Sequence, residues 1–287
     1  MNNDFSKYNW MAATPAIDVL SLTELSLPGT HNAGSDWKAD YALLPGRHLL
    51  ACQHDSFFAQ LNHGARALDL RLACLSKVKG IMKYRCRHNT FLSSRTLLDL
   101  VYDVKTFLHL NPDEFVILDF HELADSEGAF DFKEFNQHMI EQLGPRMIPA
   151  RNARLSLTEL KRINPMQRIL ACAPWHIDLD SNLFGRKIEH KWEEKSSTKA
   201  SNLKNYISDV MTNPPGTWEP WSLSAATYTI PIGPVDLHEE LDDWFDPDRS
   251  DWAVKSSIIN VDFIEESKIV DFCRTANLIK ANRKQPR

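Results

Sequence analysis

Three residues from separate stretches of the chain carry side chains that could together cleave a phosphodiester. His31 follows a Pro-Gly-Thr turn, Arg71 ends an alternating apolar run, and His88 ends another short run. One histidine could accept a proton and the other donate one, while the permanently charged guanidinium holds an anionic phosphorus between them. These residue types predict a site in which a neighbouring hydroxyl attacks a phosphodiester.

Short runs rich in β-branched and aromatic residues predict the strands that must position these groups. The expected strands are residues 24–28, 67–71, 84–88, 115–121, 168–173, 187–192, 222–229 and 258–263. The clearest helix is 95–110, because its leucines and valines share one face and Asn111-Pro112 ends it. Further helices are expected over 131–143, 201–211 and 267–278.

Strands that alternate with helices over 287 residues predict an α/β fold, a single distorted (β/α)8 barrel of the TIM type. We expect one domain over residues 1–287, with residues 1–20 as an N-terminal extension. The connection from Arg71 to Tyr84 is too short for a full helix, so the barrel should be imperfect. Such barrels carry catalytic groups at the carboxyl ends of their strands. Those ends carry His31, Arg71, His88, His121, Trp175, Trp192, Tyr228 and Asp262.

Charge and cysteine content argue against several other classes of protein. The net charge is −5, so the chain as a whole would not attract a nucleic acid. The five cysteines lack CxxC spacing, which argues against a zinc site and a disulfide framework, although Cys74 and Cys86 could pair in an oxidising compartment. No signal peptide or membrane-spanning run is visible. We expect a monomer made in the cytoplasm, with any export by a leaderless route.

The ordered motifs resemble the X domain of phosphatidylinositol-specific phospholipases C. They are Leu-Pro-Gly-Thr-His-Asn ending at Asn32, the run 64–71 ending in Asp69-Leu70-Arg71, Arg87-His88-Asn89, and the segment 111–120. The resemblance is strong over residues 22–123, patchier over 169–192 and weak at 259–263. It implies a distorted TIM-type barrel that cleaves a phosphoinositide. The inositol 2-hydroxyl would attack phosphorus, releasing diacylglycerol and a cyclic inositol phosphate.

The resemblance also assigns roles to matching residues. His31 would be the general base and His88 the general acid. Asp262 would orient His31 and favour its charged form, and Arg71 would stabilise charge on the phosphorane oxygens. Calcium-dependent members carry a metal-binding carboxylate where Arg71 stands, whereas bacterial members carry arginine. Asp69-Leu70-Arg71 follows the bacterial form, which implies catalysis without a metal cofactor.

Two positions depart from the bacterial pattern. Asn32 stands where bacterial members carry an aspartate that assists the acid, and His121 stands where relatives carry lysine or glutamate. A hybrid site with calcium held by Asn32, Asp69 and a neighbour stays open, although Arg71 would oppose it. Asp69 itself could orient Arg71 or hold the loop after His31.

Substrate-binding residues are expected on later strands. His190 and Trp192 fall where the family carries an inositol-contacting aspartate and tyrosine, so His190 could reach a hydroxyl and Trp192 stack on the ring. A core position is the alternative for Trp192, and His121 and Tyr228 complete the expected binding set.

The expected partner is phosphatidylinositol or a related anionic phospholipid at a membrane surface. Aromatic and apolar residues near two strand ends could insert into that surface or could be ordinary packing. They are Trp37, Tyr41, Leu43, Leu44, Trp218 and Trp221.

Two other functions remain open from the sequence. A catalytically silent X-domain relative would bind anionic headgroups or a protein partner, as the departures at Asn32 and His121 suggest. A metal-dependent glycerophosphodiesterase-like barrel would also pair two histidines but would hold magnesium with carboxylates, and Arg71 argues against it.

Overall fold

The computed structural model describes residues 5–41, 46–126, 128–193, 199–229 and 232–284, and its centre is a curled parallel sheet. In spatial order its strands are β7 (Phe184–Arg186), β6 (Ile169–Ala173), β5 (Val116–Ala124), β2 (Ala67–Cys74), β1 (Leu27–Thr30), β12 (Ile258–Val261), β9 (Trp221–Ser224) and β8 (Glu189–Lys191). Each neighbouring pair in this order is parallel. The predicted distorted α/β barrel is confirmed.

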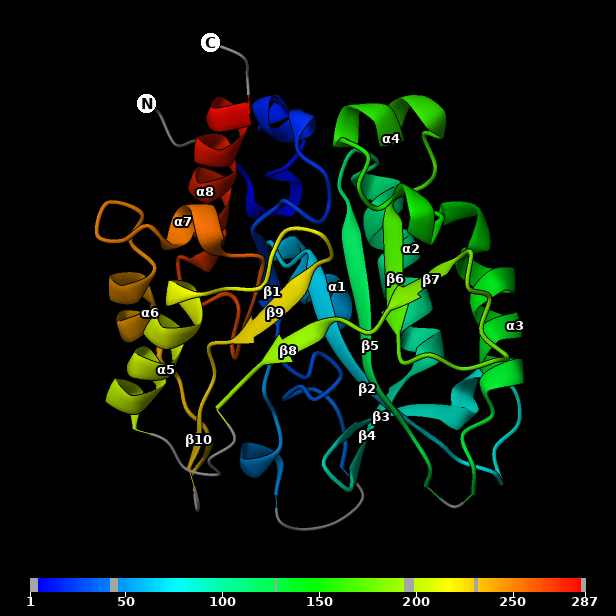
Figure 1. Ribbon diagram of the computed structural model, residues 1–287. Helices are drawn as coiled ribbons and strands as arrows, with labels where there is room; N and C mark the ends of the chain where they lie inside the picture. The colour runs from blue at the N-terminus through cyan, green and yellow to red at the C-terminus, as the bar shows by residue number, and fades with distance from the viewer. Residues whose placement is uncertain (1–4, 42–45, 127, 194–198, 230–231, 285–287) are drawn as a thin grey trace.

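The barrel is open on one side. β7 and β8 end the strand order, and within the described residues no ladder joins them. Only Lys187 and Ile188 separate the two strands in sequence, and Figure 1 shows the chain passing directly from one to the other. With no helix between them, β8 does not return beside β7 as a right-handed crossover would place it. We call this open side the seam.

The helices flank the sheet (Figure 1). They are α1 (Phe57–Asn62), α2 (Leu97–Leu110), α3 (Phe132–Leu143), α4 (Leu157–Ile163), α5 (Ala200–Thr212), α6 (His238–Trp244), α7 (Trp252–Lys255) and α8 (Ile269–Lys284). The predicted helix 95–110 begins later because Thr96 caps it: its hydroxyl accepts from Asp99 N, and the Asp99 carboxylate accepts from Thr96 N. Among the described residues, no helix is both long and apolar enough to cross a bilayer.

Two strand predictions need correction, and one strand of the central sheet was not predicted. Residues 84–88 do form β3 (Tyr84–His88), but it runs antiparallel to β2 and to β4 (Phe91–Thr96), as a side ribbon. The predicted strand 222–229 ends at Ser224, and Tyr228 lies in β10 (Tyr228–Thr229), which pairs with β11 (Gly233–Pro234). β7 was missed, because its three residues, Phe-Gly-Arg, show no alternation.

The segment before β1 is part of the core. Trp10 is fully buried, and its indole N–H donates to Gly64 O over 3.0 Å. The buried pair of Arg66 Nη2 and Glu114 Oε2, 2.6 Å apart, lies beneath this segment, and Glu114 also accepts from Ala12 N. These contacts fix the start of β2, which carries part of the site.

Candidate active site

His31 and Asp262 are brought together by the pairing of β1 with β12. Thr30 and Val261 are register partners, so the residue that follows each strand projects from the same end of the barrel. His31 Nδ1 lies 2.8 Å from Asp262 Oδ1, and Asp262 is almost fully buried. Burial raises the pKa of Asp262, and the neighbouring His31 offsets part of that rise.

Arg71 is held by Asp69 on the same face of β2. Arg71 Nη2 and Nε donate to the two carboxylate oxygens of Asp69, over 2.8 and 3.2 Å. Asp69 Oδ2 also accepts from Asn32 N, so Asp69 both orients the arginine and holds the loop after His31. Burial alone would raise the pKa of Asp69, but Arg71 and His121 hold it far below its usual range.

His88 ends β3 and is buried beside a segment that sequence reasoning missed. Its Nδ1 lies 2.7 Å from the carbonyl of Leu50, so Nδ1 carries a proton and Nε2 is the free nitrogen. Burial lowers the pKa of His88 to about 4. Cys52 Sγ lies 3.8 Å from His88 Nδ1 and within 4.8 Å of the nearest ligand atoms of His31 and Asp262. Cys52 therefore joins the two histidines into one site.

Each histidine is followed by an asparagine with left-handed backbone. Asn32 has φ 44° and Asn89 has φ 52°, a conformation that asparagine tolerates better than most residues. The turn carries the chain away from the strand end while the histidine stays at the rim. The Asn32 side chain is fully buried, and among the described residues neither its oxygen nor its nitrogen has a hydrogen-bond partner. Asn32 therefore does not hold His88.

Beside these groups lies a set of polar side chains with few protein partners. Asp119 of β5 is the register partner of Asp69, and among the described residues neither of its carboxylate oxygens accepts a hydrogen bond. Burial and the charge of Asp69 raise the pKa of Asp119 well above its usual value. His121 Nδ1 lies 3.9 Å from Asp119 Oδ2, and the His121 ring lies 4.8 Å from the ring of His190.

This set borders a cavity of about 360 Å³, lined by His121, Lys187, Ile188, Glu189, His190 and Trp192. Sequence reasoning missed Asp119 and Lys187. The signal for Asp119 was a carboxylate in an otherwise apolar strand, two residues before His121 and therefore on the same face. His190 Nδ1 lies 2.6 Å from Ser222 Oγ, which fixes its ring, and burial lowers the pKa of His190 to about 3.

Some of the predicted aromatic residues lie at the rim with His31, and others lie elsewhere. Trp192 is 52% exposed at the end of β8, so the core alternative for it was wrong. Tyr228 packs edge-on against His88 with ring centroids 6.4 Å apart, and Trp37 is partly exposed. Trp221 is buried in the core, and Trp218 precedes β9 at the opposite end of the strands, so neither lies at the rim with His31. Tyr41 donates to Asp36 O, and Leu43 and Leu44 lie outside the described residues.

The donors around Arg71 do not fit a calcium ion. Both carboxylate oxygens of Asp69 are taken by Arg71, and the guanidinium places a permanent positive charge beside the Asn32 loop. Calcium needs six to eight oxygen ligands, typically including carboxylates. Arg71 therefore argues against the hybrid calcium site.

No family model matches the chain, whereas comparisons of sequence and of structure both find phospholipases C or a phosphatidylinositol phosphodiesterase. The chain is 39% identical over 105 residues to a variant-surface-glycoprotein phospholipase C from Trypanosoma cruzi, a match that covers 34% of this chain and 25% of that protein. It is 26% identical over 133 residues to a 1-phosphatidylinositol phosphodiesterase from Listeria monocytogenes, covering 46% of this chain and 38% of the relative. The chain thus spans well under half the length of these two relatives.

Solved structures extend the likeness over nearly the whole chain. The phosphatidylinositol-specific phospholipase C from Listeria monocytogenes superimposes with a TM-score of 0.73 at 19% identity, covering 95% of this chain and 99% of that one. A phosphatidylinositol-specific phospholipase C from Staphylococcus aureus gives a TM-score of 0.69 at 15% identity, covering 93% and 97%. The resemblance seen in the motifs is confirmed: the chain has the fold of bacterial phosphatidylinositol-specific phospholipases C and resembles enzymes of this type in sequence.

Proposed function

We propose that the protein cleaves phosphatidylinositol-type lipids by attack of the inositol 2-hydroxyl on phosphorus. The products are diacylglycerol and a cyclic inositol phosphate. The observation that carries the proposal is the convergence of His31, Arg71 and His88 at one end of the barrel, each fixed by a protein partner. A new bond from the 2-oxygen to phosphorus forms while the bond from phosphorus to the glycerol oxygen breaks.

His31 takes the proton of the attacking hydroxyl. Its Nδ1 is bound to Asp262, so Nε2 is the nitrogen that accepts the proton. The buried carboxylate of Asp262 stabilises the imidazolium that forms. The proton thus leaves the 2-hydroxyl as the oxygen closes on phosphorus.

Arg71 supplies the positive charge at phosphorus. Asp69 engages Nε and Nη2, which leaves Nη1 and the outer edge of the guanidinium for a non-bridging phosphate oxygen. Because the guanidinium stays charged and is already oriented, we propose that the reaction needs no metal cofactor.

His88 returns a proton to the glycerol oxygen from Nε2. In the free protein burial lowers the pKa of His88, so the ring is neutral near pH 7. An anionic phosphate beside the ring favours its protonated form. Substrate binding would therefore charge the general acid.

The inositol ring is proposed to occupy the cavity beside His121 and His190. Its hydroxyls would give Asp119 and His121 the hydrogen-bond partners that the described residues do not supply. The exposed Trp192 suits stacking on the ring, and the exposed Trp175 and Ile177, which follow β6 at the same rim, suit a membrane surface.

A phosphorus NMR time course on phosphatidylinositol vesicles in EDTA tests the proposal. A cyclic phosphodiester signal is expected from the wild type and from His109→Ala, an exposed histidine on α2 that serves as the control. His31→Ala and His88→Ala should each lose it. Full activity in both variants would refute the assigned roles, and vesicle binding without turnover in the wild type would favour the silent relative. Activity only after a divalent metal is added would refute the metal-free reaction.

A further inference from the structure

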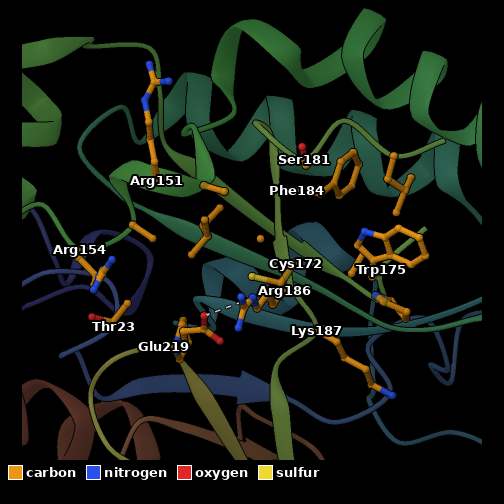
Figure 2. A pocket seen from close by; sticks show the side chains of 18 of the residues that line it. Thr23, Arg151, Arg154, Cys172, Trp175, Ser181, Phe184, Arg186, Lys187 and Glu219 are labelled. Carbon is orange, nitrogen blue, oxygen red and sulfur yellow. Dashed lines mark ion pairs between the residues drawn. The ribbon is translucent and has the colours of Figure 1, made fainter. Parts of the chain in front are cut away.

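A second cavity, of about 610 Å³, opens along the seam (Figure 2). Its inner wall is formed by Leu170 and Cys172 of β6 and by Phe184 of β7. At the amino ends of the strands it is bordered by Arg151, Arg154, Trp218 and Glu219, and at the carboxyl ends by Trp175 and Lys187. We call it the seam cavity. Its volume lies in the range of small-molecule sites.

The charge of the seam cavity is opposite to that of the whole chain. Its wall carries four permanent or near-permanent cations against one carboxylate, a formal balance of four minus one, or +3, with His176 counted neutral. The cations are Arg151, Arg154, Arg186 and Lys187, and the carboxylate is Glu219. The chain as a whole has a net charge of −5. A concave wall of one sign selects ligands of the other sign, so the cavity suits an anion.

Two of the arginines are placed to receive such an anion. The Arg154 guanidinium stacks 3.8 Å from the ring centroid of Trp218, which limits the orientations it must give up on binding. Arg186 Nε lies 3.8 Å from Glu219 Oε1, too far for a hydrogen bond, and both side chains are largely exposed. Figure 2 shows Arg154, Arg186 and Glu219 on the same side of the cavity. An anion could replace Glu219 as the partner of Arg186.

The rest of the wall suits a ring with an apolar face. Leu170, Cys172 and Phe184 exclude water from the inner side. Aromatic rings pack against the apolar faces of polyol rings while charged groups orient the polar substituents.

The seam cavity borders the active site without sharing its histidines 31 and 88. Lys187 lines both cavities. Cys172 is the register partner of Asp119, so the two sites are separated by about one strand spacing, roughly 4.8 Å at this level of the sheet. A ligand in the seam cavity would therefore lie beside a headgroup in the active site.

We propose that the seam cavity is a second binding site for a phosphorylated polyol ring. It rests on the proposed function, because the reaction would bring this chemistry to the protein in two forms: the headgroup of a further lipid molecule and the free inositol phosphate product. The arginines bind the phosphate, and the inner wall of Leu170, Cys172 and Phe184 packs on the ring.

The binding test uses inositol 1-phosphate as the probe and an Arg71→Gln background, which weakens phosphate binding at the active site. Isothermal titration should show one saturable site in this background. Adding Arg154→Gln and Arg186→Gln together should weaken it by roughly tenfold or more, because two charge-assisted hydrogen-bond donors are lost. Adding Arg162→Gln, an exposed arginine on α4 outside the cavity, should leave the affinity unchanged.

A variant that is expected to bind the probe more tightly excludes misfolding as the cause of weaker binding. Glu219→Gln removes the competing carboxylate and should strengthen binding severalfold, which a damaged fold would not do. No saturable binding in the Arg71→Gln background, or equal affinity in the arginine double variant and the Arg162→Gln control, would overturn the proposal.

Sedimentation with vesicles separates the two sources of the ligand. Binding to phosphatidylcholine vesicles serves as the reference for headgroup-independent binding. If the arginine double variant loses affinity for phosphatidylinositol vesicles but not for these reference vesicles, the site takes lipid headgroups. If the variant loses affinity for the soluble probe alone, the site takes the free product. Neither measurement requires turnover. A wild type that never cleaves phosphatidylinositol would remove the proposed function and leave the seam site standing.

Discussion

The two halves of the proposed active site differ in how their polar groups are satisfied. In the reacting half, His31, Arg71 and His88 are each bound to a protein partner, namely Asp262, Asp69 and the Leu50 carbonyl. In the headgroup half, Asp119 and the Nδ1 atom of His121 have no hydrogen-bond partner among the described residues.

This difference separates two physical tasks. Groups that must meet charge developing at phosphorus act best when they are oriented beforehand, since no reorganisation is then needed during the reaction. Groups that recognise hydroxyls must be free to accept them, and a buried group left without a partner costs stability. Substitutions in the reacting half should therefore lower turnover, and neutral substitutions in the headgroup half should raise stability and weaken substrate binding.

Apart from the loss expected on removing either histidine, the largest effect is expected from Arg71→Lys, which keeps the charge and removes the two-point contact with Asp69. Lysine cannot hold both oxygens of Asp69 and contact phosphate, so kcat/KM should fall by about 10²–10³. Vesicle assays of initial rate would measure it. Arg95→Lys is the matched control, because Arg95 makes the same two-point contact with Asp36 outside the reacting half. Equal losses of kcat/KM in both variants would show that breaking an arginine–aspartate contact lowers activity through stability alone.

Asp262→Asn should have the next largest effect. The amide keeps the size of the side chain but no longer stabilises the His31 imidazolium, so kcat should fall by about 10–10² with KM little changed. Steady-state kinetics on phosphatidylinositol would separate the two constants. If KM changed and kcat did not, Asp262 would act in headgroup binding and not in the reaction.

Stability should fall as pH is lowered, with a contribution from each half. Burial lowers the pKa of His88 to about 4 and that of His190 to about 3, whereas both are near 6.5 in the unfolded chain. Between these values the unfolded state binds more protons, so acid favours unfolding, by on the order of 2 kcal/mol per histidine between pH 7 and 4.5. Urea unfolding at the two pH values should show a smaller difference in His190→Gln. The exposed control His109→Gln should match the wild type, and an unchanged difference in His190→Gln would contradict the assignment.

The smallest effect is expected from Asp119→Asn. Because burial raises the pKa of Asp119 in the folded protein, this carboxyl group lowers stability at pH 7, and that stability is regained as pH falls. Asparagine removes the cost, so the free energy of unfolding at pH 7 should rise by about 1 kcal/mol while KM rises a fewfold. Asp113→Asn, at an exposed position, is the control in the same urea titration. A destabilised Asp119→Asn protein with unchanged KM would place Asp119 in the framework instead.

The sequence determined the groups at the strand ends and the barrel that carries them. His31, Arg71 and Asp262 could be placed because alternation, a turn motif and the rule for parallel strands are local or general patterns. Helix 95–110 was likewise marked by its apolar face and by the stop at Asn111-Pro112.

Only the tertiary structure decided how those groups are partnered and which side of the barrel is open. The Leu50 carbonyl and Cys52 reach His88 from a segment with no strand or helix signal, and among the described residues Asp119 accepts no hydrogen bond. The seam exists because β7 and β8 follow one another too closely to pair, and the three arginines around it come from two separate segments of the chain. Burial and hydrogen bonding depend on neighbours that are distant in sequence, so no pattern within a single segment could have predicted them.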